Sequence, residues 1–166
     1  AMAILLALRS PERCRVLGIS TVGGNVGVEQ SAINTAKIIH YAGVVGKVPI
    51  FKGMSPPASG GNAAEVHGPE GIGRIDRFLS NFRQPDFGDL LAGFKEHLEK
   101  LEEKRVTLVA TGPLTNIAYL TRECPEYVKR LRRIVIMGGA FDEPGNREAA
   151  PEFNIFTDPE SAISVL

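Results

Sequence analysis

Short apolar runs alternate along this chain with segments in which apolar side chains follow a helical spacing. Unbroken aliphatic runs are typical of buried strands, and they predict strands at residues 14–21, 47–51, 105–111 and 132–139. Helices are predicted at residues 1–8, 28–42, 88–103 and 112–124, and from Pro159 onward. This alternation predicts an α/β fold with an open, mostly parallel Rossmann-like sheet and helices on both faces.

Local signals refine some of these elements. Asp158 is suited to cap the last helix, whose first position is Pro159, and Gly112 and Pro113 are suited to open the helix at 112–124. The apolar run at residues 1–8 is expected to enter the core as a helix. No internal repeat or domain boundary is visible, so we expect residues 1–166 to form a single domain.

One long connection interrupts the pattern. Residues 52–87 are rich in glycine, proline, serine and asparagine, and they contain His67 within the motif HGPEGIG. A loop of this length inside a compact domain is usually functional or mobile.

The segment PEFNIF at residues 151–156 places polar residues inside an apolar stretch. In an extended segment Phe153 and Ile155 would point to one face, and Glu152 and Asn154 to the other. A solvent-facing sheet surface would explain this pattern without any function. The alternative is that Glu152 and Asn154 line a cleft.

Glycine turns follow three of the predicted strands, in STVGGN, ATGPLTN and IMGGAF. Ligands of parallel α/β sheets bind at the carboxyl ends of the strands, so we expect a site there. Its candidate polar side chains are Asn25, Asn146, Asn154 and Glu152. Amides and a carboxylate suit a vicinal diol, because each hydroxyl both donates and accepts a hydrogen bond. The pattern therefore indicates a sugar.

Composition and motifs argue against several other classes. The 19 basic and 19 acidic residues cancel, which removes the electrostatic argument for nucleic acid or an anionic membrane surface. The longest apolar run is far shorter than a membrane span. Cys14 and Cys124 have no zinc-site spacing and favour reduced thiols in a cytoplasmic protein. A dinucleotide motif, a phosphate-binding loop and a G-x-S-x-G elbow are all lacking.

Five motifs, in order, resemble the inosine-uridine preferring nucleoside hydrolase family. They are GISTVGGNVGVEQSAINTAKII, HGPEGIG, ATGPLTNIA, IVIMGGAF followed by GN, and EFNIFTDPESA. The resemblance implies a calcium-dependent enzyme that hydrolyses the N-glycosidic bond of ribonucleosides to free base and ribose. It also implies a ribonucleoside as partner and a homodimer or homotetramer.

The resemblance assigns roles residue by residue. Asn25 resembles an amide next to the metal, and Thr111 a residue whose main-chain carbonyl is a calcium ligand. Met137, which could instead be a core residue, resembles an apolar contact beside the ribose. The groups that grip the ribose hydroxyls are matched by Asn146, Glu152 and Asn154. His67 resembles a histidine near the base, where it is a candidate proton donor; the alternative is a structural residue of the loop.

Two parts of the family pattern are missing. The D-x-D-x-x-x-D-D strand expected before residue 1 and the His-Asp pair expected beyond residue 166 would supply most calcium ligands and the general base. A single carbonyl cannot hold calcium, which takes six to eight oxygens. We therefore expect this chain alone to bind no calcium and to be a fragment of an enzyme. The alternative is a truncated, non-catalytic homologue that binds ribose or serves as an assembly module.

Overall fold

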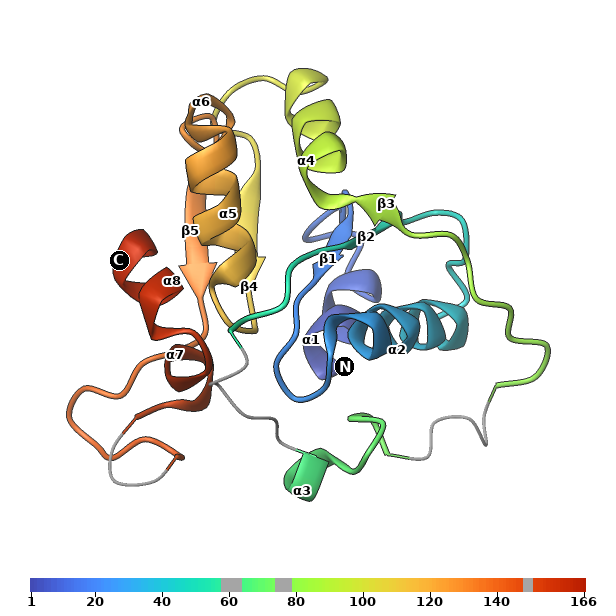
Figure 1. Ribbon diagram of the computed structural model, residues 1–166. Coiled ribbons are helices and arrows are strands. Elements are labelled where there is room, and N and C mark those ends of the chain that lie inside the picture. Colours follow the sequence, from blue (N-terminus) through green and yellow to red (C-terminus); the bar gives the residue numbers. More distant parts are fainter. Residues whose placement is uncertain (58–63, 74–78, 148–150) are drawn as a thin grey trace.

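The computed structural model describes residues 1–57, 64–73, 79–147 and 151–166. Its helices are α1 (Met2–Leu8), α2 (Val28–Tyr41), α3 (Ala64–His67), α4 (Leu90–Glu99), α5 (Thr115–Glu123), α6 (Pro125–Val128), α7 (Phe153–Thr157) and α8 (Pro159–Val165). Its strands are β1 (Ile19–Thr21), β2 (Ile50–Lys52), β3 (Gly88–Asp89), β4 (Thr107–Ala110) and β5 (Arg133–Ile136). The mixed α/β class that the sequence predicts is therefore confirmed (Figure 1).

The strands form two parallel sheets in the described part of the chain. The first has the order β1-β2-β3, and the second pairs β4 with β5, with Val109 opposite Val135. Parallel pairing agrees with the prediction, while the division into two sheets was not predicted. The strands are shorter than the apolar runs, because only the residues that find a ladder partner are strand.

Each sheet carries its own part of the core. Helix α2 packs against β1 and β2 through Ala36, Ile39 and Ile50. Helices α5 and α8 pack against each other and against one face of β4–β5. The opposite face of β4–β5 carries Val109 and Val135, whose side chains are 62% and 43% exposed.

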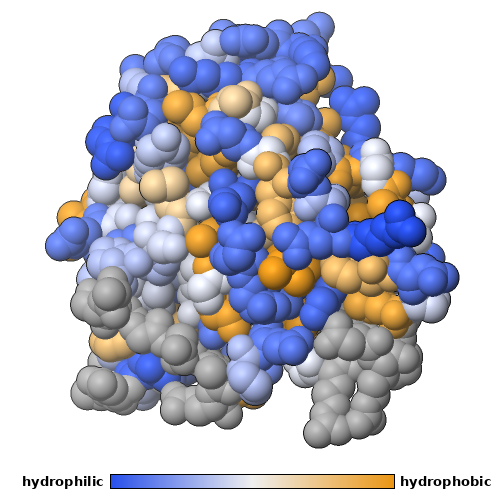
Figure 2. All heavy atoms as spheres, turned by 45° about the vertical axis from the view of Figure 1, so that its right-hand side comes forward, coloured by the Kyte–Doolittle hydropathy of each residue, from blue (hydrophilic) through white to orange (hydrophobic). Residues whose placement is uncertain are grey.

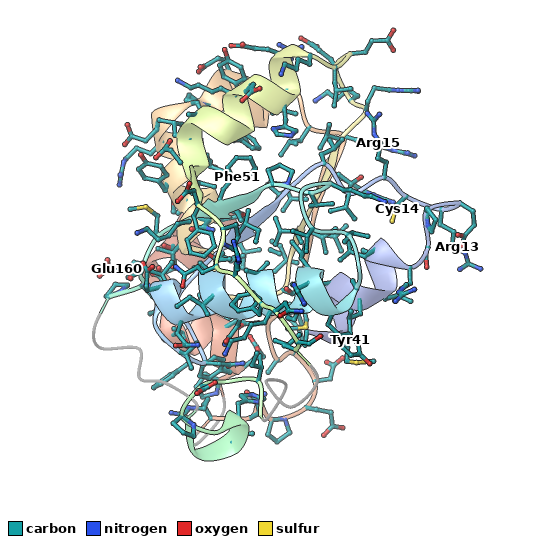
Figure 3. All side chains as sticks on the ribbon, turned by 90° about the vertical axis from the view of Figure 1, so that its right-hand side faces the viewer. Arg13, Cys14, Arg15, Tyr41, Phe51 and Glu160 are labelled. Carbon is teal, nitrogen blue, oxygen red and sulfur yellow. The ribbon has the colours of Figure 1, made fainter. Side chains whose placement is uncertain are left out.

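Glycines let the first sheet approach α4 closely. The ring of Phe51, labelled in Figure 3, lies against Gly18, Gly88 and Gly93, in the space that a side chain at each of these positions would need. A Cβ on Gly18 would lie 2.7 Å from Phe51 Cε2, and one on Gly88 would lie 2.8 Å from Phe51 Cδ1. One aromatic ring therefore joins β2, β3 and α4.

The expected core role of the first helix is wrong. Helix α1 has no buried residue, and Met2 and Leu6 are 78% and 71% exposed. Only Leu8 packs against the cluster between α2 and β2. Helix α1 contacts α2, yet none of its residues is buried, so apolarity alone does not place it in the core. Figure 2 shows apolar patches between polar side chains on one face of the molecule.

The predicted start of the last helix agrees with the structure. Asp158 caps α8, and its carboxylate accepts hydrogen bonds from the Ser161 N–H (3.0 Å), the Ser161 hydroxyl (2.7 Å) and the Thr115 hydroxyl (2.5 Å). The Asp158 side chain is 1% exposed, and these donors compensate for its burial. Helix α5 begins at Thr115, so Pro113 precedes it rather than opening it.

None of the described helices combines the length and hydropathy of a membrane span.

Candidate functional site

The segments that follow β1, β2 and β4 meet at one edge of the molecule. Asn116, near the start of α5, is 7% exposed. Its side-chain amide donates to the Thr21 carbonyl (2.9 Å) and accepts from the Met54 N–H (2.8 Å). A side chain on Gly53 would collide with both Thr21 and Asn116, so only glycine fits there. Sequence reasoning did not find this role of Asn116.

The turn after β1 also reaches the segment that contains the predicted sugar-binding residues. A Cβ on Gly24 would lie 3.2 Å from Pro113 Cδ and 3.9 Å from Phe153 Cε1. Asn25 is the next residue in this turn and is half-buried. The turn after β1, the loop after β4 and α7 are therefore in contact.

The segment 151–156 is not extended, so the predicted two-face arrangement is wrong. Helix α7 begins at Phe153, and Glu152 is its N-cap. Glu152 Oε2 accepts from the N–H groups of Asn154 (3.0 Å), Ile155 (3.2 Å) and Gly139 (3.3 Å). The Glu152 carboxylate satisfies these N–H groups, and the helix packs Ile155 against the core of α5 and α8, which the alternating pattern does not reveal.

The three polar residues expected to grip ribose lie together around the start of α7. The Asn154 side chain is 5% exposed and donates to the Met137 carbonyl at 3.0 Å. Asn146 is exposed, and its Oδ1 accepts from the Phe153 N–H at 2.8 Å. Each of the three side chains, Glu152 included, therefore uses one of its atoms for hydrogen bonds that hold α7 to the segment after β5.

Met137 and Thr111 follow the ends of β5 and β4. The Met137 N–H donates to the Ala110 carbonyl at 2.8 Å, which extends the pairing of the two strands by one residue. The Met137 side chain is 56% exposed, so the alternative of a core residue is wrong. Thr111 is exposed directly after β4.

Residues 139–146 and Glu152 line an open hollow beside α7. Its lining includes the exposed carboxylates of Asp142 and Glu143, and Phe141, which is 94% exposed. Sequence reasoning missed these three residues, although the acids in AFDEPGN follow directly after a strand end. The hollow does not include Asn25 or Thr111.

His67 lies at the end of α3 and is exposed. The motif that follows it reaches the turn of Asn25, because a Cβ on Gly71 would lie 2.8 Å from Val26 Cγ1. No hydrogen bond in the described ranges joins His67 to another predicted site residue. The structure therefore brings the HGPEGIG motif to this edge without placing the imidazole in the hollow.

The described ionisable groups with shifted pKa values lie elsewhere: they are the amine of Ala1, Glu96 on α4, Cys124 between α5 and α6, and Tyr127 on α6. Burial raises the pKa of the Cys124 thiol, and a hydrogen bond from Lys100 lowers the pKa of Glu96. The Tyr127 hydroxyl donates to Glu99, which raises the pKa of Tyr127.

The residues present do not fit a calcium ion. Calcium takes six to eight oxygen ligands, usually several of them carboxylates. The described ranges contain no group of three or more His, Cys, Asp and Glu side chains placed to hold a metal. The Thr111 carbonyl supplies one neutral oxygen, which is far fewer than such an ion requires.

Comparison with known proteins gives a consistent result. The sequence model of the inosine-uridine preferring nucleoside hydrolase family matches residues 1–166. The non-specific ribonucleoside hydrolase RihC of Escherichia fergusonii is 40% identical over 168 residues, covering 100% of this chain and 53% of the relative. The same protein of Escherichia coli is also 40% identical.

Solved structures agree with these relatives. A plant nucleoside hydrolase, PpNRh1, has a TM-score of 0.80 and 32% identity, covering 99% of this chain and 52% of that one. A purine-preferring ribonucleoside hydrolase from Gardnerella vaginalis has a TM-score of 0.78 and 31% identity, covering 98% and 52%. The chain spans about half the length of the curated relatives it matches. Because the family match extends over every residue, the chain belongs to the inosine-uridine preferring nucleoside hydrolase family.

Proposed function

We propose that a polypeptide containing these residues hydrolyses the N-glycosidic bond of ribonucleosides. Water adds to C1′ of the ribose, the bond to the base breaks with its electron pair leaving on the base, and the base gains a proton. The names of the relatives support this reaction, since they are ribonucleoside hydrolases. The observation that carries the proposal is the cluster of Asn146, Glu152 and Asn154 around the start of α7, beside an open hollow.

The atoms that remain for a ligand suit a sugar diol. In the described hydrogen bonds Glu152 uses Oε2 and Asn146 uses Oδ1. We assign ribose binding to Glu152 Oε1, which accepts, and to Asn146 Nδ2, which donates. Two adjacent hydroxyls can satisfy both groups at once. In this proposal Asn154 supports these two groups by fixing the start of α7.

Charge gives Glu152 a second role in the proposal. As the base leaves, positive charge develops on the ribose, and a preorganised carboxylate stabilises that charge more than it stabilises the neutral substrate. Asp142 and Glu143 add negative charge around the same hollow. Asn25 would contact the opposite side of the site, and Met137 would offer apolar contact to the sugar.

Calcium and the general base are expected only from parts of the longer relatives that have no counterpart in these residues. We propose calcium dependence for the longer polypeptide, with the Thr111 carbonyl as one ligand. We propose that His67, exposed at the end of α3, protonates the leaving base.

A second candidate function is a non-catalytic assembly module. It is favoured by the exposed face of β4–β5, because parallel sheets are normally covered on both faces and Val109 and Val135 are not. The same surface supports the proposal of a homodimer or homotetramer. A cytoplasmic location is also proposed, supported by the free thiols of Cys14 and Cys124.

A chimera tests the enzymatic proposal. Residues 1–166 replace the stretch of Escherichia fergusonii RihC that aligns with them, and release of reducing sugar from inosine and uridine is measured. We expect release by the chimera, a large loss with Glu152→Gln, and no change with Glu160→Gln, which removes an exposed charge from α8. A folded chimera that releases no ribose would favour the assembly module.

A further inference from the structure

The motif HGPEGIG contains a tight turn built for one conformation. The Gly71 N–H donates to the Gly68 carbonyl at 3.0 Å, with Pro69 and Glu70 between them. Proline favours the second position of such a turn. Gly68 and Gly71 have φ of +79° and +78°, which side chains rarely adopt, and a side chain on Gly71 would also press on Val26.

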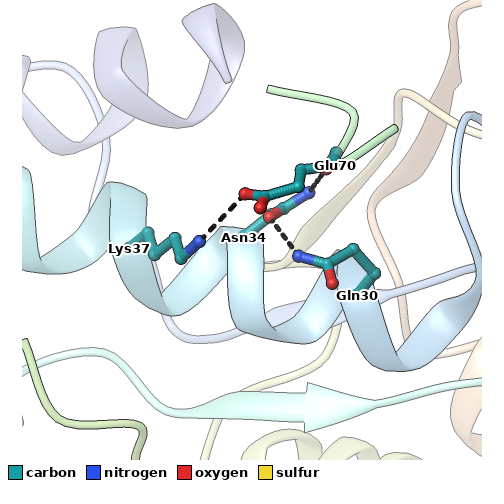
Figure 4. Close-up of polar contacts among 4 residues, drawn as sticks. All are labelled: Gln30, Asn34, Lys37 and Glu70. Carbon is teal, nitrogen blue, oxygen red and sulfur yellow. Dashed lines mark hydrogen bonds and ion pairs between the residues drawn. The ribbon is translucent and has the colours of Figure 1, made fainter. Parts of the chain in front are cut away.

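Helix α2 binds this turn at two points of a single residue, Glu70 (Figure 4). The Asn34 amide donates to the main-chain carbonyl of Glu70 at 2.5 Å. The Lys37 ammonium lies 3.4 Å from Glu70 Oε2. Asn34 and Lys37 are three positions apart, so both lie on the same face of α2. One contact depends on the backbone of the turn and the other on its side chain.

The two α2 side chains that form this attachment are themselves buried and held in place. Asn34 is 5% exposed, and its Oδ1 accepts from Gln30 Nε2 at 2.9 Å, which turns the NH₂ group toward Glu70. The Lys37 side chain is 11% exposed, unlike that of an ordinary surface lysine. A buried ammonium needs a nearby anion or acceptor, so its contact with Glu70 is worth more than that of an exposed ion pair.

We propose that Asn34 and Lys37 are positioning residues that hold the HGPEGIG turn against α2, next to the turn of Asn25. They thereby fix the position of the chain directly after His67. The attachment is a property of the chain itself. Its effect on nucleoside turnover rests on the proposed function.

Hydrogen exchange of the Gly71 amide in the 166-residue chain measures the attachment directly. We expect Asn34→Ala and Lys37→Met each to speed this exchange about fivefold, which corresponds to about 1 kcal/mol at 25 °C. Lys100→Met is the matched control, because Lys100 forms an exposed ion pair with Glu96 on α4 (2.6 Å). Exchange of the β4–β5 amides must stay unchanged, which separates local release from unfolding.

The two contacts can be told apart with Glu70→Ala, which removes the carboxylate and keeps the carbonyl. Glu70→Ala should speed exchange less in the Lys37→Met variant than in the unmutated chain, because both substitutions remove the same contact, whereas adding Asn34→Ala should speed exchange further. If a variant unfolds, Glu70→Gln repeats the test with the shape of the side chain kept. Unchanged Gly71 exchange in both Asn34→Ala and Lys37→Met would overturn the proposal.

The chimera adds the catalytic readout. We expect Asn34→Ala to lower kcat for nucleosides with poor leaving bases more than for activated ones, as loss of a correctly placed His67 would. If the variants exchange Gly71 faster but the chimera is inactive, the attachment is supported and the proposed function is contradicted. If the chimera is active but Gly71 exchange stays slow in all variants, the proposed function is supported and the attachment is contradicted.

Discussion

The side-chain amide of Asn154 donates a hydrogen bond of 3.0 Å to the main-chain carbonyl of Met137. Asn154 belongs to α7, and Met137 is the first residue after β5. Asn154 is 5% exposed, so the donor of this part-buried bond is shielded from water, and the bond fixes the helix to the strand end.

We therefore expect Asn154→Ala to lower the free energy of unfolding by about 1–3 kcal/mol, since it leaves a carbonyl without its donor. Urea unfolding measures the loss. Gln84→Ala, at an exposed position, is the control and should change stability by less than about 0.5 kcal/mol. Equal stability of the two variants would mean that water replaces the Asn154 amide.

Glu152 combines a cap and a charge, and two substitutions separate them. Glu152→Gln keeps a side-chain oxygen for the N–H groups of α7, so it should cost little stability, whereas Glu152→Ala should cost about 0.5–2 kcal/mol. Both should lower kcat/KM of the chimera by the equivalent of about 2–4 kcal/mol, because both lose the carboxylate. Stability is measured by thermal unfolding and activity by kinetics. Full catalytic activity of Glu152→Gln would mean that Glu152 acts only as a helix cap.

The buried thiol of Cys124 predicts an alkaline limit of stability. Burial raises the pKa of Cys124 in the folded chain, so at high pH the unfolded chain ionises first and gains stability relative to the folded one. Stability from this group is complete below the ordinary thiol pKa and is lost as pH rises through the raised value. Urea unfolding between pH 8 and pH 11 tests the trend.

Thiol labelling gives an independent check of that burial. Cys14 is exposed and Cys124 is buried, so one thiol of the native chain should react quickly and both should react in denaturant. Cys14→Ser should abolish the fast reaction. A fast reaction that persists in Cys14→Ser would show that Cys124 is accessible.

The role of His67 is tested by the leaving group. In the chimera, His67→Ala should slow hydrolysis of nucleosides with poor leaving bases more than that of activated ones, because a lost proton donor matters least when the base needs no proton. An equal loss for both substrates would leave His67 as a structural residue of the loop.

Local signals predicted the start of α8 and the extent of α2 well, because the deciding interactions there are themselves local. Asp158 and Pro159 begin α8 as expected, because a cap binds N–H groups within three residues. Helix α2 ends one residue from its expected limit, since its apolar face repeats over four turns. The segment 151–156 failed because a short alternating pattern also fits a helix whose N-cap is an unusual residue, Glu152.

Contacts between distant segments could not be predicted in this way. The bonds of Asn34 to the carbonyl of Glu70, and of Asn154 to that of Met137, join side chains to main-chain atoms that carry no sequence signal. The resemblance assigned Asn146, Glu152 and Asn154 to one site, and these three residues do lie together around the start of α7. It did not predict that Glu152, Asn146 and Asn154 would each use one atom to hold the backbone.

The amide of Asn116 has a consequence for the order in which the chain can fold. Its partners, Thr21 and Met54, lie 95 and 62 residues earlier in the chain. The hydrogen bonds at the ends of β1 and β2 therefore cannot form until α5 has been synthesised. Closing loops of this length costs entropy before the bond repays it, which makes such contacts slow to form. A nascent chain that has not yet reached α5 leaves both backbone groups to water, and its first sheet becomes fully fixed only after the second begins to form.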